Sequence, residues 1–142
     1  MSHVKIMVHC VWGTKNRAGI LTSERQNQLF DHIYQNAKSK DIHIDSIGGY
    51  FDHVHCLISL GADQSIAKVM QLIKGEASSW ANKNKITGFK FEWAEDYFAG
   101  SVSESITEKV RNYIRNQGKH HQKMSFSDEY NQFLNRYGIP LG

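Results

Sequence analysis

The fold is decided by the stretch Asp52-His53-Val54-His55-Cys56-Leu57-Ile58, in which apolar and imidazole side chains alternate. In a β-strand, residues two apart point to the same face of the sheet. The alternate apolar residues from Val54 to Leu60 are therefore expected to face the core. His53 and His55 would share the opposite face, close enough to bind one metal ion. Two surface histidines on a half-exposed strand would give the same pattern, and a metal site needs a third ligand that this strand does not supply.

The segments on either side of this stretch alternate between strand-like and helix-like patterns. Further strands are expected over residues 3–12, where alternation places Val4, Ile6, Val8, Cys10 and Trp12 on one face, over 41–47, which joins 53–60 through Gly48-Gly49, and within 89–98. Helices are expected over 22–38, opened by the capping-box pair Ser23 and Gln26, and over 65–82.

The resulting order, β-α-β-β-α-β, is that of the ferredoxin-like motif. It predicts an α+β fold whose antiparallel sheet carries helices on one face and leaves the other face free for a site. An additional C-terminal helix is expected to open at the capping-box pair Ser105 and Glu108, to carry Tyr113 and to run toward Gln117. Gly118 would end or kink that helix, and a short terminal helix is expected over 127–136.

Size and composition indicate one ordinary globular domain spanning residues 1–142. A net charge of +3 and a pI of about 8.9 permit nucleic-acid binding without demanding it. No apolar run is long enough to cross a membrane, and the start lacks the apolar stretch of a signal peptide. Cys10 and Cys56 are interpreted as buried free thiols of a cytoplasmic protein, in preference to a disulfide or a metal pair.

A second motif lies in the expected tyrosine helix, where Tyr113 and Gln117 are four residues apart and would be neighbours on one helix face. A phenol oxygen and an amide oxygen could both serve a metal-assisted reaction. A core aromatic beside a solvated glutamine explains the same spacing. His120 and His121 could also be ligands, although a basic surface tail accounts for them equally well.

Taken together, these motifs resemble the single-tyrosine transposases of IS200/IS605-type insertion sequences, and are also similar to REP-associated tyrosine transposases. The resemblance covers nearly the whole chain in the right order. It is carried by Val11-Trp12-Gly13-Thr14-Lys15-Asn16-Arg17, by Gly48-Gly49 through His55, by Glu92-Trp93 through Ser103, by Tyr113 through His121, and by the ending from Phe126 to Ile139.

The resemblance implies a histidine-hydrophobic-histidine nuclease with Tyr113 as nucleophile and His53, His55 and Gln117 as ligands of one divalent metal ion per site. Mg²⁺ or Mn²⁺ is implied, and imidazole ligands suit Mn²⁺ better. Homodimers are implied, in which the tyrosine helix can act in trans, in the other subunit. The implied substrate is single-stranded DNA with hairpins at the element ends, and the implied location is the prokaryotic cytoplasm, associated with the nucleoid.

The chemistry expected of such a site is cleavage through a 5′-phosphotyrosine intermediate, because a covalent phosphodiester retains the energy needed to rejoin DNA. Neutral ligands would leave the charge of the ion facing the phosphate, where it acts as Lewis acid and template. Candidate phosphate contacts are Lys15, Arg17, Lys74, Arg111 and Arg115, each of which could equally be a solvated surface charge.

Three alternatives share these motifs. The first is a domesticated relative that cuts host repeat hairpins, and the second is a hairpin-binding protein that has lost cleavage. The intact set of His53, His55, Tyr113 and Gln117 argues against the second. The third is an unrelated ferredoxin-like metalloprotein whose tyrosine is structural.

Overall fold

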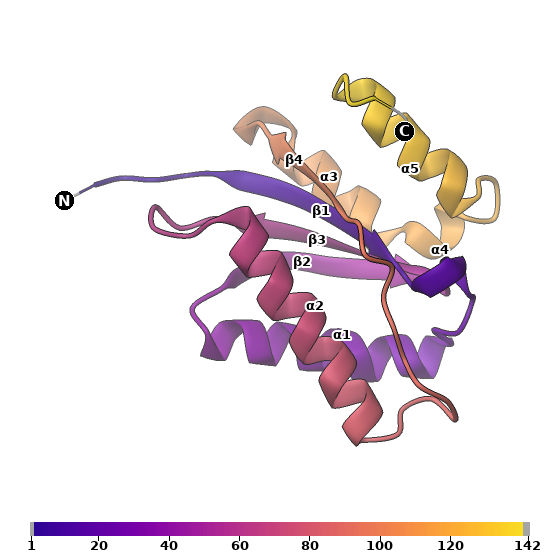
Figure 1. Cartoon of the computed structure of the whole chain (residues 1–142). Helices are drawn as coiled ribbons and strands as arrows, with labels where there is room; N and C mark the ends of the chain where they lie inside the picture. The colour runs from indigo at the N-terminus through magenta and orange to yellow at the C-terminus, as the bar shows by residue number, and fades with distance from the viewer. Residues whose placement is uncertain (1, 141–142) are drawn as a thin grey trace.

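The computed structural model describes residues 2–140 and contains a four-stranded antiparallel sheet with the strand order β2-β3-β1-β4 (Figure 1). The strands are β1 (Met7–Gly13), β2 (His43–Tyr50), β3 (His53–Ser59) and β4 (Phe98–Val102). This order and the alternating elements confirm the expected ferredoxin-like α+β fold. The histidine strand β3 lies inside the sheet, between β1 and β2, and not at an edge.

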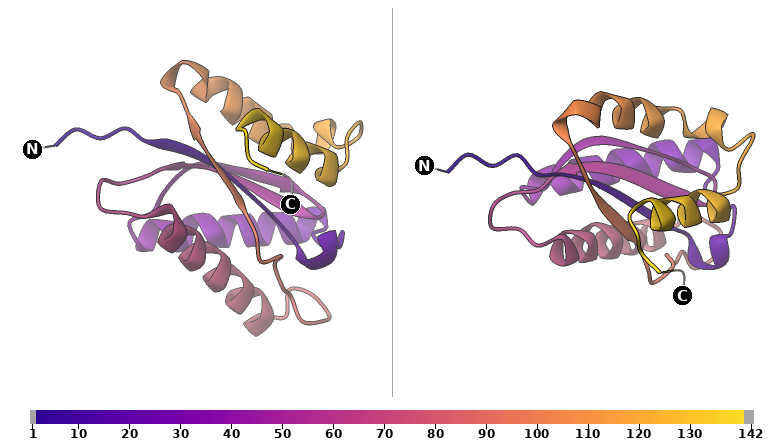
Figure 2. Two further views of the ribbon diagram at one scale, coloured as in Figure 1. Left: turned by 45° about the horizontal axis from the view of Figure 1, so that its top comes forward. Right: turned by 90° about the horizontal axis from the view of Figure 1, so that it is seen from above.

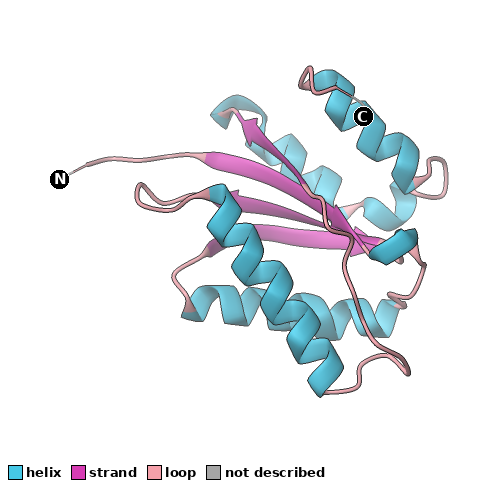
Figure 3. Cartoon of the chain, in the orientation of Figure 1, coloured by secondary structure: helices cyan, strands magenta, loops and turns pink. Residues whose placement is uncertain are grey.

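Helices cover both faces of this sheet (Figures 2 and 3). On one face lie α1 (Ser23–Ser39) and α2 (Ile66–Lys83). On the other lie α3 (Thr107–Arg115), the short α4 (Gln117–His120) and α5 (Phe126–Arg136). Two 3₁₀ turns, η1 (Lys15–Arg17) and η2 (Glu104–Ile106), precede α1 and α3. The C-terminal helices therefore cover the face that we expected to be free, and they enclose the histidines.

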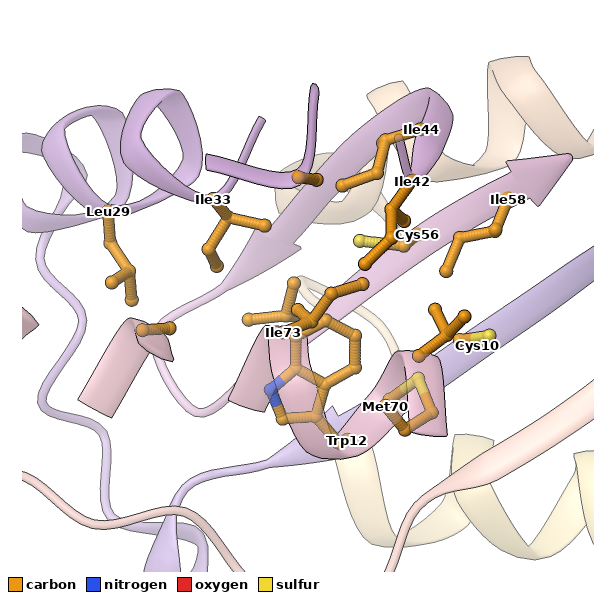
Figure 4. Close-up of a cluster of buried hydrophobic side chains, with 14 of the residues drawn as sticks. Cys10, Trp12, Leu29, Ile33, Ile42, Ile44, Cys56, Ile58, Met70 and Ile73 are labelled. Atoms are coloured by element: carbon orange, nitrogen blue, oxygen red, sulfur yellow. The ribbon is translucent and has the colours of Figure 1, made fainter. Parts of the chain in front are cut away.

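The main core lies between the sheet and the pair α1 and α2 (Figure 4). Alternation along β3 places Val54, Cys56 and Ile58 in this core, as the sequence predicts. Cys10 lies opposite Cys56 in the β1–β3 register, and both are buried free thiols. Burial raises the pKa of the Cys10 thiol to about 12, which keeps it protonated and unreactive.

Two expected strands begin elsewhere in the structure. The first starts at Met7, so that Val4 and Ile6 are each 44% exposed and take no part in the core. Most of the segment 89–98 is irregular, because the side chain of Asn82 hydrogen-bonds both backbone polar groups of Phe91 in place of a strand partner. The aromatic enrichment there reflects packing, since Phe91 and Trp93 stack edge to face.

The expected helix starts were also displaced. Thr22, and not Ser23, caps α1, its hydroxyl accepting a hydrogen bond from the backbone of Arg25. No side chain caps α3, so the expected capping box of Ser105 and Glu108 is wrong; Ser105 lies in the preceding 3₁₀ turn. The tyrosine helix ends at Arg115, and Gln117 opens the separate helix α4. Tyr113 and Gln117 nevertheless stay adjacent, because the Gln117 amide nitrogen donates to the Tyr113 carbonyl oxygen at 3.2 Å.

Candidate active site under the C-terminal helices

The site is built on the face of β3 that points away from the main core. His53 and His55 both have no exposed side-chain surface there, so they are not the surface histidines of the simpler interpretation. In the register of the sheet, Gly48 of β2 lies opposite His55. An ideal Cβ on Gly48 would meet the backbone of Ile114, so the absence of a side chain lets α3 approach the sheet beside the histidines.

A third histidine, His121, joins the pair from the segment after α4. Each of the three imidazoles has its Nδ1 atom held by a partner. His53 Nδ1 lies 2.7 Å from Asp52 Oδ1. His55 Nδ1 lies 2.8 Å from His9 Nε2, and His121 Nδ1 lies 2.6 Å from the Met124 carbonyl oxygen. These contacts fix the orientation of the three rings and turn each Nε2 atom toward the same point.

The carboxylate of Glu129, from α5, lies at that point and is only 1% exposed. Its Oε1 atom is 3.4 Å from His53 Nε2, 3.1 Å from His55 Nε2 and 3.2 Å from His121 Nε2. The Oε1 atom of Gln117 lies 3.0 Å from His53 Nε2 and 2.9 Å from His121 Nε2. The structure therefore brings together His53, His55 and Gln117 as expected, and adds His121 and Glu129.

Tyr113 reaches the same cluster from α3. Its hydroxyl donates to the second carboxylate oxygen of Glu129 and lies 3.2 Å from His120 Nε2. The Tyr113 ring stands edge to face against His55, with 5.7 Å between ring centroids. The half-buried tyrosine also lines a cavity of about 370 Å³ between α3 and α5. One chain thus supplies the histidines and the tyrosine together.

The two β3 histidines differ in their protonation. Burial opposes the charged form of His53, but hydrogen bonds to Asp52 and Glu129 outweigh it and raise the pKa of His53 to about 9. Burial lowers the pKa of His55 to about 4, against the opposing hydrogen bond to Glu129. A positive charge on His53 beside a neutral His55 balances the buried Glu129 carboxylate.

The same network sets the acidity of the two oxygen groups. Burial would raise the pKa of Glu129, but hydrogen bonds from His121, His53 and His55 outweigh it and hold that pKa well below its usual range. Burial and the hydrogen bond to Glu129 raise the pKa of Tyr113 well above its usual range. A divalent cation between the imidazoles would act in the opposite sense and favour the phenolate.

The donor set fits a divalent metal ion. The nitrogen atoms of His53, His55 and His121 and an oxygen of Glu129 all lie within 4.8 Å of one another. Imidazole and carboxylate groups are ordinary ligands of first-row transition ions. His53 and His121 carry the carboxylate and carbonyl partners that such ligands usually have, whereas the partner of His55 is the imidazole of His9.

The five expected phosphate-binding cations do not line the cavity at Tyr113. Four of them have partners within the chain: Lys15 pairs with Glu92, Arg17 lies over the Phe126 and Tyr130 rings, Lys74 donates to the Ala94 carbonyl oxygen, and Arg111 forms a two-pronged contact with Asp45. Arg115 is exposed. Their role in DNA binding stays a prediction.

Two residues of the site, Glu129 and His9, are not among the site residues that the sequence predicts. Glu129 interrupts the apolar stripe of α5 formed by Phe126, Tyr130 and Phe133, and a charged residue at such a position is a signal that could have found it. His9 shares a face of β1 with Val11, the register partner of His55, so strand pairing would have found it too.

The chain as a whole is similar to a known class of enzyme, the transposases. The family model described as transposase, IS200-like, matches residues 2–117, so the chain belongs to the IS200-like transposase family. The ISDra2 transposase TnpA of Deinococcus radiodurans is 26% identical over 115 residues, covering 77% of this chain and 81% of that protein.

Two solved structures share the fold. A Deinococcus radiodurans R1 protein assigned as a transposase has a TM-score of 0.65 and 23% identity, over 82% of this chain and 93% of its own. A REP-associated tyrosine transposase bound to a REP hairpin also has a TM-score of 0.65, with 16% identity over 85% of this chain and 72% of its own. Membership of the family removes the unrelated metalloprotein from the alternatives. None of the helices described over residues 2–140 combines the length and apolar character of a membrane span.

Proposed function

We propose that this transposase cuts and rejoins single-stranded DNA with Tyr113 as its nucleophile. One observation carries the proposal: the Tyr113 hydroxyl and the Nε2 atoms of His53 and His55 contact the same carboxylate, that of Glu129. Only the Glu129 side chain therefore separates the nucleophile from the imidazoles that can hold a cation. Phosphoryl transfer requires a nucleophile held close to a cation that stabilises the charge on the phosphate.

The reaction begins with attack of the Tyr113 phenol oxygen on a backbone phosphorus. The bond from phosphorus to the 3′-oxygen breaks, the phenol loses its proton, and the leaving 3′-oxygen gains one. The 5′-phosphate stays on Tyr113 as a phosphodiester. A second 3′-hydroxyl then attacks that phosphorus and releases the tyrosine, so the strands are rejoined without an external energy source.

The metal part of the proposal rests on His53, His55 and Gln117, whose ligand atoms face one another. A bound Mg²⁺ or Mn²⁺ ion would supply Lewis-acid stabilisation of the phosphoryl charge. In this arrangement His53 and His55 fix the position of that charge, because Asp52 and His9 hold their rings. Gln117 is held by the Tyr113 carbonyl oxygen and so moves with the tyrosine.

The proposed substrate is a single strand that folds into hairpins. A relative with the same fold is bound to a REP hairpin, and the cavity beside Tyr113 is flanked by the cations Lys109 and Arg136. At about 370 Å³ the cavity is within the size range of ligand sites and could admit an unpaired nucleotide. Hairpin strands should bind more tightly than a plain duplex of the same sequence, and equal affinity would contradict this assignment.

The deciding experiment incubates the protein with end-labelled single-stranded element ends and Mn²⁺, and looks for a covalent protein–DNA adduct on a denaturing gel. Tyr113→Phe removes one oxygen atom and should abolish the adduct while leaving hairpin binding nearly intact. Tyr34→Phe, on the exposed side of α1, is the matched control and should cleave like the wild type. An adduct formed by Tyr113→Phe would show that another residue is the nucleophile.

The homodimer and the trans arrangement of the tyrosine helix remain predictions. One chain brings Tyr113 to its own His55, which supports cleavage within a single subunit. A mixture of His53→Ala and Tyr113→Phe proteins distinguishes the two arrangements. Cleavage returns in mixed dimers if the helix acts in trans, and stays absent, with subunit exchange verified, if each subunit uses its own tyrosine.

A further inference from the structure

We propose that His121 and Glu129 complete the metal site of this transposase, so that the ion is held by three imidazoles, one carboxylate and the Gln117 amide. The inference rests on the proposed metal-assisted function and extends its ligand set. Both added residues lie beyond residues 2–117, the part that the family model matches, so they come from the C-terminal part of this particular chain.

The first argument is the arrangement of protons. The Asp52 carboxylate and the Met124 carbonyl can only accept hydrogen bonds, so the Nδ1 atoms of His53 and His121 carry the protons that face them. Without an ion, protons on Nε2 atoms hold the cluster together through hydrogen bonds to the oxygens of Glu129 and Gln117. A divalent ion would replace those protons, because a ring that keeps its Nδ1 proton can offer its Nε2 lone pair as a ligand. The three nitrogens and the two oxygens would then all face the ion.

The second argument is the spacing of these atoms. With bonds of about 2.1 Å to a first-row ion, neighbouring ligands of an octahedron stand about 3.0 Å apart and those of a tetrahedron about 3.4 Å. The contacts of Glu129 Oε1 with the three Nε2 atoms measure 3.1, 3.2 and 3.4 Å. Those of Gln117 Oε1 measure 2.9 and 3.0 Å. These contacts match the spacing of neighbouring ligands in one coordination sphere, and the ligand atoms of the three histidines and Glu129 all lie within 4.8 Å of one another.

The third argument concerns the second oxygen of Glu129, which accepts the hydrogen bond from Tyr113. A carboxylate that binds the ion with one oxygen and the phenol with the other holds the nucleophile beside the ion. Helix α5 thus contributes to the reaction centre, and does not only cover the sheet. The adjacent His120 contacts Tyr113 and the same outer oxygen, and so stands outside the ligand sphere.

This ligand set also defines the class of ion. Three imidazoles with two oxygen ligands suit borderline transition ions such as Mn²⁺, Co²⁺ or Zn²⁺. Mg²⁺ prefers an all-oxygen, largely hydrated octahedron and is disfavoured at such a site. Five protein ligands would still leave room at the ion for a phosphate oxygen.

The test is a Co²⁺ titration of the purified protein without DNA, followed by visible absorption. Wild type should bind one equivalent and show the ligand-field bands of a low-symmetry nitrogen and oxygen site. His121→Ala and Glu129→Gln should each weaken binding at least about 100-fold, since removing even a residue that only orients a ligand costs about 10–100-fold. His32→Ala, which removes a histidine beside Glu76 on the other side of the sheet, is the matched control and should stay within about threefold of wild type. Excess Mg²⁺ should not displace Co²⁺.

The outcomes separate this inference from the broader proposal. If His121→Ala and Glu129→Gln are folded and bind Co²⁺ as wild type does, while His53→Ala and His55→Ala do not, the extended ligand set is wrong and the histidine-pair site stands. Displacement of Co²⁺ by Mg²⁺ would overturn the assignment of the ion. If wild type binds no ion, both metal proposals fail, while the tyrosine adduct remains testable by itself.

Discussion

Gly48 of β2 lies against the backbone carbonyl group of Ile114 in α3, so closely that an ideal Cβ atom at Gly48 would stand 2.3 Å from the carbonyl oxygen. No side chain can occupy that space. Because Gly48 is the register partner of His55, the close approach seats the tyrosine helix directly beside the histidine strand. The distance from Tyr113 to the imidazoles therefore depends on a glycine of a neighbouring strand.

Gly48→Ala should separate these two elements. We expect the variant to lose about 1–3 kcal/mol of unfolding free energy, the usual cost of overpacking, and to lose DNA cleavage by a larger factor than hairpin binding. Urea denaturation and the adduct assay measure the two effects. Gly75→Ala is the control, because nothing lies within 4 Å of a Cβ atom there and the change should stabilise α2 by about 0.5–1 kcal/mol. An unchanged urea midpoint for Gly48→Ala would show that α3 can shift without cost.

The histidine face and the core were predictable because strand periodicity is local. Alternation along the stretch from His53 to Ile58 already separates core-facing from site-facing residues, and the structure confirms that division. The extent of the strands was less predictable. Val4 and Ile6 continue the alternation of β1 but lie outside the core, because neither packs against the helices beneath the sheet.

The complete site could not be read from the sequence because its parts are joined by tertiary contacts. Glu129 meets His55 across 74 residues of separation, and His9 meets it across 46. No local sequence motif around Glu129 or His9 predicts its contact with His55. The sequence predicts α5 with apolar packing on its inward face, and only the structure shows that the Glu129 carboxylate is buried among those aromatic residues.

The ion pair between Asp45 and Arg111 should make stability depend on pH. The hydrogen bond from Arg111 lowers the pKa of Asp45 from 3.8 to about 2, against the smaller effect of burial. A depressed folded-state pKa stabilises the protein above the unfolded pKa of about 3.9, and this contribution is lost as the pH falls through about 2. Because the pair is partly exposed, we expect it to contribute about 1 kcal/mol to the free energy of unfolding at neutral pH.

Asp45→Asn tests this contribution. Its urea midpoint should fall below that of wild type at pH 7, and the difference should shrink as the pH falls through about 2. Asp31→Asn, an exposed carboxylate of α1, should show little difference at any pH. A gap between Asp45→Asn and wild type that does not narrow between pH 7 and pH 2 would mean that the carboxylate charge is not its source.

The cations beside the Tyr113 cavity, Lys109 and Arg136, are expected to bind DNA phosphates. Replacing both with alanine should weaken the binding of single-stranded hairpin DNA and lower the slope of log affinity against log salt by about 0.7 for each phosphate that is no longer neutralised. Fluorescence anisotropy at several salt concentrations measures this slope. Lys83, on the opposite helix layer, is a suitable control. If the double variant keeps the wild-type slope, the strand does not pass along this cavity.

His9 is expected to act on the metal site through His55. Its Nε2 atom lies 2.8 Å from His55 Nδ1, and burial, aided by the charge effect of His55, lowers the pKa of His9 to about 3, so that His9 is neutral and can accept the His55 proton. That hydrogen bond leaves His55 Nε2 free to bind an ion.

His9→Leu should weaken Co²⁺ binding about 10–100-fold, the usual effect of removing such a partner. His9→Gln keeps an acceptor and should recover most of the affinity, whereas a defect caused by packing alone would not be rescued. His32→Leu, on the other side of the sheet beside Glu76, should bind Co²⁺ as wild type does. If His9→Leu also retains wild-type affinity, His55 keeps its orientation without this hydrogen bond, and His9 serves packing against Phe133 instead.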